Sequence, residues 1–289
     1  MEAKEESLRV GEISFTNTRN LYYYLRKLCR EPGIRYLKGT PAQLNCLLRS
    51  GEIDLCVSSS IEYAYDSSRY LVLPGYGIAS RGPLPSIRLF SRVPLERLDG
   101  ATICLTTESA TSVALCRVLL GRLLGQENRY VTLSADLEDG LDEAEGLVLI
   151  GDRALAANPR ALQFDLYIYD LSLLWQQLTG LPFVFALWII REDSALAAGE
   201  LLSRFWRALI RSHELIADPD EELIRSVLAD RNYFTRQSLL DYWNLIAYEL
   251  TDDHLAGLEL FYRLCHESGI LQRPAEVRFF DPEKNISAA

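Results

Sequence analysis

The chain has 289 residues, of which 48% are hydrophobic and 24% are charged, a composition typical of a folded globular protein. Its formal net charge of −10, without any basic stripe, argues against a nucleic-acid partner. The length is sufficient for one large domain or for two lobes, each with its own core.

The beginning of the chain, residues 1–6, is charged and lacks the apolar segment of an export signal. The longest apolar stretch, 181–190, is too short to cross a bilayer. We therefore expect a cytoplasmic protein that does not enter the membrane. Six cysteines lack the spacing of a metal site and are expected to be buried free thiols, so no metal is predicted.

The first part of the chain alternates between strand and helix signals. Capping-box patterns at 40–43 and 59–62 each predict the start of a helix, and Gly51 predicts the end of the first of these helices. Residues 74–85 contain three prolines and three glycines and are predicted to be irregular. The other predicted elements are a strand at 8–14, a helix after it, a strand at 53–57 and an extended segment at 86–90.

A second strand–helix series begins near Asp99, and helices alone follow from Asp193. This order predicts an α/β protein whose two lobes face each other across a ligand cleft. We expect 1–92 to form the first lobe, 93–188 the second, and 189–289 to return to the first as C-terminal helices. The predicted elements are strands at 101–105, 130–133, 147–150 and 166–169, a strand or buried crossing at 181–190, a helix at 109–124, a solvated acidic segment at 135–145, and helices at 194–216, 219–229, 235–250 and 252–268.

Hydroxyl side chains crowd the turn between the strand at 101–105 and the helix after it. Thr107, Ser109, Thr111 and Ser112 exceed what one helix cap needs. A helix N-terminus carries unpaired N–H groups and partial positive charge, so this turn is a candidate carboxylate or phosphate site. A generously capped helix explains the same residues.

Other polar residues follow strand ends, where ligands of α/β proteins bind. Asn17 offers a paired donor and acceptor, or forms an Asx turn. Arg81 can hold a carboxylate with its guanidinium, or form a salt bridge. Ser14, Ser59, Ser86, Gly151 and Asp152 are further candidates, each with a capping or turn role as the alternative. No nucleophile elbow, phosphate-binding loop, dinucleotide fingerprint or zinc-protease motif occurs, so spacing indicates only an anion-binding protein with two lobes.

Four motifs, taken in this order, indicate a protein family more specifically than the chemistry of their residues does: GEIDLCVSSSIEYA, IASRGPLPSIRLFS, LDGATICLTTESATSVAL and LTGLPFVFALW. Together they resemble the MqnA family of chorismate dehydratases, which belongs to the futalosine route to menaquinone. The resemblance covers residues 8–190. It implies the two-lobed type II periplasmic-binding-protein fold and conversion of chorismate to 3-[(1-carboxyvinyl)oxy]benzoate with loss of water and without a cofactor.

The resemblance also implies roles for particular residues. Asn17 and Ser86 match the family's site residues and are expected to be catalytic, and residues 109–112, which include Ala110, match its anion site. Ser172-Leu173-Leu174 replaces the family's usual glycine and acidic pair, so no acid or base role is transferred there. The implied partner is dianionic chorismate, bound by a monomer or weak homodimer.

Three other functions remain open from the residues alone. A sister enzyme that makes dihydroxynaphthoate shares the fold, but its first strand ends in a different motif. A non-catalytic receptor for a small anion would use the same cleft. A ligand-sensing regulator would need a DNA-binding module, and no helix-turn-helix precedes residue 8.

Overall fold

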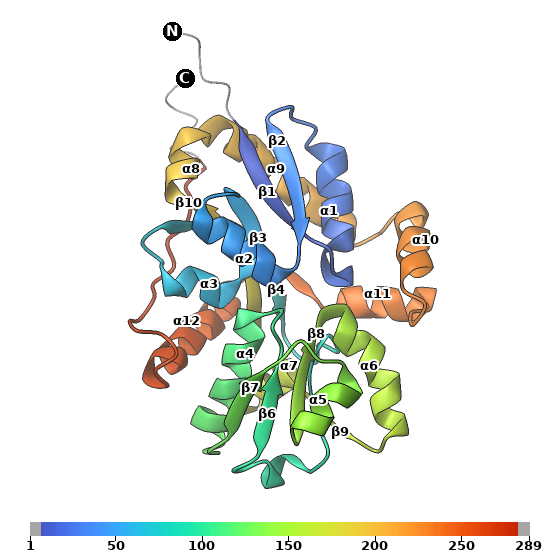
Figure 1. Cartoon of the computed structure of the whole chain (residues 1–289). Coiled ribbons are helices and arrows are strands. Elements are labelled where there is room, and N and C mark those ends of the chain that lie inside the picture. The colour runs from blue at the N-terminus through green and yellow to red at the C-terminus, as the bar shows by residue number, and fades with distance from the viewer. Residues whose placement is uncertain (1–6, 283–289) are drawn as a thin grey trace.

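The computed structural model describes residues 7–282. Figure 1 shows two sheets, one above the other, each covered by helices. The six-stranded sheet has the order β11-β4-β10-β3-β1-β2 and the five-stranded sheet the order β7-β6-β8-β5-β9. The α/β architecture with two lobes is therefore confirmed.

In the six-stranded sheet, β10 is an antiparallel strand between β3 and β4, next to a parallel group of three strands. All its residues but the last are buried, which explains why this stretch reads as a continuous apolar run. The strands are β1 (Leu8–Ile13), β2 (Ile34–Gly39), β3 (Leu55–Ser59), β4 (Tyr70–Ser80), β10 (Phe183–Arg191) and β11 (Ala247–Glu249).

The five-stranded sheet is built from one continuous stretch of chain. Its first strand in sequence, β5, is antiparallel to β8 and β9, whereas β6 is parallel to β7 and β8. The strands are β5 (Ile87–Ser91), β6 (Thr102–Leu105), β7 (Arg129–Thr132), β8 (Gly146–Ile150) and β9 (Tyr167–Asp170).

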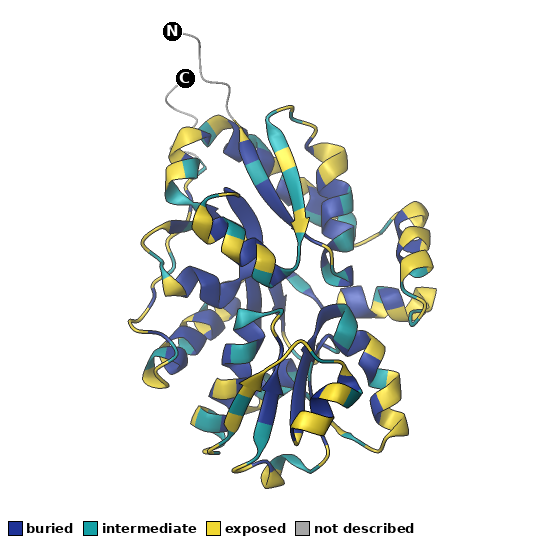
Figure 2. Ribbon diagram, viewed as in Figure 1, coloured by how far each residue is buried: buried dark blue, intermediate teal, exposed yellow. Residues whose placement is uncertain are grey.

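Helices cover both sheets, and the C-terminal helices lie on both sides of the junction between the lobes. Figure 1 shows α11 beside α6 on one side and α12 near α4 on the other. Figure 2 shows that the faces of these helices toward the sheets are buried. The helices are α1 (Thr16–Leu28), α2 (Pro41–Ser50), α3 (Ser60–Tyr65), α4 (Ala110–Arg117), α5 (Leu137–Glu143), α6 (Gly151–Gln163), α7 (Leu171–Thr179), α8 (Glu192–Ala197), α9 (Gly199–Ile216), α10 (Glu221–Asp230), α11 (Arg236–Asn244) and α12 (Asp252–Glu267).

Both α2 and α3 begin where their sequence signals predict, but only the capping box of α2 forms its side-chain hydrogen bonds. Thr40 Oγ1 accepts a hydrogen bond from Gln43 N, and Gln43 Oε1 accepts one from Thr40 N, so the first capping box is confirmed. The second is wrong: Ser59 makes no side-chain cap bond, and Glu62 pairs instead with Arg49 of α2.

The prediction that 74–85 is irregular is wrong for 74–80, which belong to β4, and is confirmed for 81–85, which contain no helix or strand. Its pairing with β10 shifts register between Val184 and Ala186 and again between Leu187 and Ile189. A Cβ on Gly77 would lie 2.6 Å from the carbonyl oxygen of Ala186, so glycine permits this close approach.

Other element predictions need correction. The expected helix 235–250 ends at residue 244 and gives way to β11, the helix 194–216 is broken at residue 198, and the helix at 109–124 changes to a π-helical segment at Val118–Leu123. Strand β2 and helix α7 were not predicted. The strands also place the two crossings between the sheets earlier than the expected lobe boundaries. Because β5 belongs to the second sheet, the chain crosses within 81–86, whereas the expected boundary follows residue 92. The chain returns to the first sheet within 171–182, whereas the expected boundary follows residue 188.

All six cysteines are free, as predicted, and five are buried, whereas Cys46 is exposed. Across residues 7–282, no helix is both long and apolar enough to cross a membrane. Residues 1–6, in which no export signal is expected, lie outside the described residues. The acidic residues of segment 135–145 are largely exposed, as expected.

A glycine in α12 lets that helix pack against the chain just before β10. A Cβ on Gly257 would lie 2.2 Å from the carbonyl oxygen of Pro182, whereas a Cβ on Gly121 would have no neighbour closer than 3.8 Å. We expect Gly257→Ala to lower the free energy of unfolding by about 1–3 kcal/mol through overpacking. Urea denaturation measures this, and Gly121→Ala is the matched control. Equal stabilities of the two variants would contradict this packing.

His213 of α9 is partly buried, and its two buried ring nitrogens have no hydrogen-bond partner. Its ring stacks on Tyr76 at 4.1 Å, and burial lowers its pKa to about 3. Since the unfolded chain takes up this proton near pH 6.5, stability falls as the pH drops below that value, by about 3 kcal/mol at pH 4. We expect His213→Phe to remove this part of the acid sensitivity in thermal unfolding followed from pH 7 to pH 4. His266→Gln should keep the wild-type profile; an unchanged profile for His213→Phe would refute the assignment.

Candidate functional site

The hydroxyls between β6 and α4 divide into two groups. Ser109 is the N-cap of α4: its Oγ accepts a hydrogen bond from Ser112 N at 3.2 Å and donates one to Ser112 Oγ at 3.1 Å. Thr106 Oγ1 accepts from the Glu108 backbone at 3.1 Å. Helix capping therefore explains part of this group of hydroxyls, in agreement with the interpretation of the sequence as a generously capped helix.

Thr111 contacts the other lobe. Its Oγ1 lies 3.3 Å from Ser60 Oγ and accepts a hydrogen bond from Ile61 N at 3.3 Å. The N-termini of α3 and α4 thus meet through a threonine hydroxyl. Thr111 does not line the cleft, so the structure does not place this side chain where a substrate binds.

A narrow cavity lies between the lobes at this point. Six of the predicted site residues line it, from the ends of β3 and β8 and the starts of α1, β5 and α4. Its volume of about 60 Å³ leaves room for only a few water molecules. The predicted residues are Asn17, Ser59, Ser86, Ser109, Ser112 and Gly151, and apolar walls come from Ile13, Phe15, Ile78, Ile87, Ile150 and Phe185.

The backbone of Asn17 is fixed by a hydrogen bond, and its side-chain oxygen is left without a partner. The Tyr248 hydroxyl donates a hydrogen bond to the Asn17 carbonyl oxygen at 2.8 Å. Asn17 Oδ1 is buried and has no hydrogen-bond partner. A buried acceptor without a donor is costly, so this atom is a strong candidate to accept a hydrogen bond from a ligand hydroxyl.

Ser86 lies at the crossing from the first sheet to the second and is 1% exposed. The Gly151 N–H donates to the Ser86 carbonyl oxygen at 2.7 Å, which extends the pairing of β5 with β8. Burial raises the pKa of the nearby Tyr242 hydroxyl well above its ordinary value, and Ser86 lowers it in part. Tyr242 therefore stays protonated and can donate a hydrogen bond beside Ser86.

Gly151 and Asp152 have structural roles at the edge of the cavity. Gly151 has φ +57°, and a Cβ there would lie 3.0 Å from the Phe15 ring. Asp152 Oδ1 accepts a hydrogen bond from Thr16 N at 3.1 Å, and Oδ2 pairs with Arg231 Nη2 at 2.8 Å. The predicted role of Asp152 as a substrate ligand is therefore corrected: its carboxylate joins α6, α1 and the C-terminal region.

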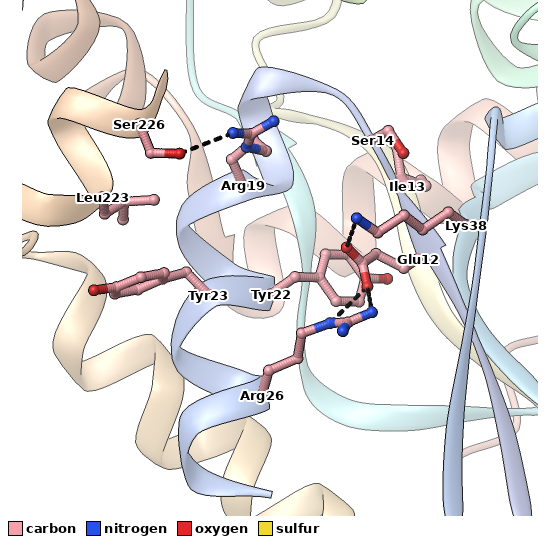
Figure 3. A pocket seen from close by; sticks show the side chains of 10 residues that line it. All are labelled: Glu12, Ile13, Ser14, Arg19, Tyr22, Tyr23, Arg26, Lys38, Leu223 and Ser226. Carbon is pink, nitrogen blue, oxygen red and sulfur yellow. Dashed lines mark hydrogen bonds and ion pairs between the residues drawn. The ribbon is translucent and has the colours of Figure 1, made fainter. Parts of the chain in front are cut away.

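Ser14 faces a different cavity, shown in Figure 3, of about 260 Å³. Glu12 in its wall is paired with Arg26, whose Nε donates at 2.8 Å, and with Lys38 Nζ at 3.8 Å. Arg19 donates instead to Ser226 at 3.3 Å and to Asp230. The charged side chains that line this cavity already form ion pairs, so we do not assign the predicted site to it.

Three further predicted residues lie away from the cavity. Arg81 is exposed and pairs with Asp253 at 3.1 Å, and it also donates to Thr251 at 2.8 Å. This is the salt bridge that the sequence left open as the alternative, and Arg81 does not line the cavity between the lobes. Thr107 and Ala110 line a second pocket on the other side of the α4 N-terminus.

Sequence reasoning missed the contribution of the C-terminal region. Arg231, Tyr242 and Tyr248 reach α1, β5 and α6 from positions some 80 to 230 residues away in the chain. Trp243 Nε1 also donates to the Thr16 carbonyl oxygen at 2.9 Å. The one available signal was the aromatic content of 242–248, which an amphipathic helix explains equally well.

Residues 7–282 contain no cluster of three or more His, Cys, Asp or Glu side chains that could hold a metal ion. The polar groups of the cavity are an amide, hydroxyls and a helix N-terminus. Such groups orient an anion and its hydroxyls by hydrogen bonding.

Comparison with known proteins gives matches over most of the chain. The family described as "Menaquinone biosynthesis" matches residues 8–267. A chorismate dehydratase of Thermus thermophilus is 39% identical over 198 residues, which are 64% of this chain and 70% of that protein. A chorismate dehydratase of Campylobacter jejuni is 29% identical over 205 residues, 70% of this chain and 75% of that protein.

Solved structures agree on the fold. A protein of Archaeoglobus fulgidus matches with a TM-score of 0.74 at 18% identity over 93% of this chain and 100% of that one. The alkanesulfonate-binding protein of Xanthomonas axonopodis matches with a TM-score of 0.70 at 15% identity over 95% and 97% of the two chains. A Candida albicans protein described as having the generic periplasmic-binding-protein fold matches at 0.66 and 13% identity over 97% and 94%. The predicted fold is thereby confirmed.

The Asp152–Arg231 pair can be tested by a double-mutant cycle. The side chains are 18% and 26% exposed, so water screens the pair only in part. We expect Asp152→Asn, Arg231→Gln and the double variant to give a coupling free energy of about 1 kcal/mol in urea denaturation. The exposed Arg92–Asp142 pair is the matched control and should give a smaller coupling. Additive effects at Asp152 and Arg231 would show that the pair does not hold the lobes together.

Proposed function

The chain belongs to the MqnA family of chorismate dehydratases of menaquinone biosynthesis, and from this premise we propose how its own cavity carries out the reaction. The proposed reaction converts chorismate to 3-[(1-carboxyvinyl)oxy]benzoate and water, as a lyase that needs no cofactor. The observation that carries the proposal is the unpartnered Asn17 Oδ1, which faces the cavity together with Ser86 and the N-terminus of α4.

The two carboxylates of chorismate need separate donors. One carboxylate lies at the N-terminus of α4, where Ser109, Ser112 and the first free N–H groups of the helix face the cavity. Ser59 lies on the opposite wall, at the N-terminus of α3, and contributes to the second donor group. Asp152 repels neither carboxylate strongly, because its charge is paired with Arg231 and its Oδ1 accepts a hydrogen bond from Thr16 N.

The reaction breaks one C–H bond and one C–O bond of the substrate ring. The ring proton beside the ether leaves, the neighbouring hydroxyl departs, and together they form water while the ring becomes aromatic. In this scheme Asn17 Oδ1 accepts a hydrogen bond from the hydroxyl that leaves, and the Ser86 hydroxyl orients the ring. An amide and an alcohol are weak bases, so a substrate carboxylate or a bound water takes the proton.

Binding requires the lobes to separate. The cavity of about 60 Å³ is too small for chorismate, and bridges between the lobes at Thr111 and Asp152 close it. We place the moving segments at the crossings within 81–86 and 171–182. A closed state that excludes water suits a reaction driven by orientation and by formation of an aromatic ring.

A cytoplasmic enzyme that acts as a monomer or weak homodimer fits this scheme, since one chain supplies every group named. The matched relatives are dehydratases, which does not favour the sister naphthoate enzyme or a receptor that only binds an anion. The direct test is incubation of the purified protein with chorismate, followed by chromatography of the product. Formation of the enolpyruvyl benzoate supports the proposal, and binding without product overturns it.

Substitution separates the roles of the two proposed catalytic residues. We expect Asn17→Ala and Ser86→Ala each to lower kcat about 10²-fold, since each removes a polar group positioned for the transition state. KM should change less, because the carboxylate donors remain. Steady-state kinetics with chorismate measures both constants. The exposed Asn244→Ala and Ser50→Ala are matched controls and should keep wild-type values; unchanged kcat in both site variants would refute the assignment.

A further inference from the structure

A second and larger pocket lies on the other side of the α4 N-terminus, between α2, α3 and α4. Its volume is about 480 Å³, within the range of small-molecule sites. It shares Ser109 with the cleft, but none of the proposed catalytic residues lines it. We call it the α2–α4 pocket; its polar residues include Asn45, Arg49, Glu62, Thr106, Thr107, Ser109, Arg117 and Thr132.

The pocket carries positive charge in an acidic protein. Arg117 lies over the Tyr130 ring, with its Cζ 4.9 Å from the ring centre, and within residues 7–282 it forms no ion pair. A guanidinium supported by an aromatic ring and free of carboxylates is prepared to bind an anion. Ser109 and Ala110 add the positive end of α4 to the same wall.

Glu62 places an unsatisfied acceptor in this pocket. Its residue is 1% exposed, and its Oε1 is buried without a hydrogen-bond partner. Its Oε2 pairs with Arg49 Nη1 at 3.2 Å. Burial raises the pKa of the Glu62 carboxyl to about 7. A buried carboxyl oxygen that the fold leaves unsatisfied points to a hydrogen-bonding ligand.

The remaining wall is apolar. It is formed by Ala42, Tyr65, Val113, Ala114 and Ile270. A bound molecule therefore meets cations on one side, a carboxyl on another, and an apolar surface between them.

We propose that the α2–α4 pocket binds a small organic carboxylate with an apolar body and a hydroxyl group. The carboxylate pairs with Arg117 and the N-terminus of α4, the apolar body covers Val113 and Ile270, and the hydroxyl donates to Glu62 Oε1. Arg49 keeps the facing oxygen of Glu62 occupied, so Oε1 is the atom left for the ligand.

The test uses 3-hydroxybenzoate, which combines these three features, titrated into the full chain by calorimetry. Benzoate, which lacks the hydroxyl, should bind several-fold more weakly, and Glu62→Ala should abolish this difference. Arg117→Gln should weaken 3-hydroxybenzoate binding at least tenfold, since a charge-assisted hydrogen bond is lost. Arg122→Gln is the matched control, because Arg122 follows on the same helical stretch and pairs with Glu267 outside the pocket.

Arg117 distinguishes this pocket from the cleft, because it lines only this pocket. Probe binding that weakens in Arg117→Gln and persists in Arg122→Gln supports the proposal. No binding to the wild type at millimolar probe, or unchanged affinity in Arg117→Gln, would overturn it. The melting temperature of each variant shows that it is folded, and turnover of chorismate tests the proposed function separately.

Discussion

The arrangement of the cavity depends on one carboxylate, that of Asp152. It accepts a hydrogen bond from the free N-terminus of α1 and pairs with Arg231, and so it connects the second lobe, the first lobe and the C-terminal region. This fixes Asn17, which lies one residue beyond Thr16, opposite the N-terminus of α4. Because Asp152 already accepts a hydrogen bond from the N-terminus of α1, the helix N-termini that remain at the cavity include those of α3 and α4.

Residues that follow strand ends could be predicted as site residues, because in α/β sheets those ends meet at one edge. Asn17 and Ser59 reach the cavity for this reason, whereas Ser86 reaches it from the residue before β5 of the other sheet. The direction of a given side chain could not be predicted. Arg81 pairs with Asp253 instead, and Ser14 lines the separate cavity in which Glu12 pairs with Arg26.

The elements that the sequence did not reveal depend on tertiary contacts. Prolines and glycines in 74–85 are typical of loops, yet β4 is held as a strand by β10 on one side and β11 on the other. Tyr242 and Arg231 likewise join the site only through the packing of the C-terminal helices. Local patterns therefore describe β1, β3 and the cap of α2, and they contain no information about which distant segment completes the site.

The insertion of β10 between β3 and β4 has a consequence for synthesis on the ribosome. The first sheet lacks its central strand until residue 191 has emerged, and its edge strand β11 ends at residue 249. The second sheet needs only residues 87–170, so it can be complete earlier, while β3 and β4 each lack the neighbour that β10 provides. The order of assembly is thus the reverse of the order of the chain: the lobe encoded second closes first, and the strands made first are the ones that need protection from aggregation.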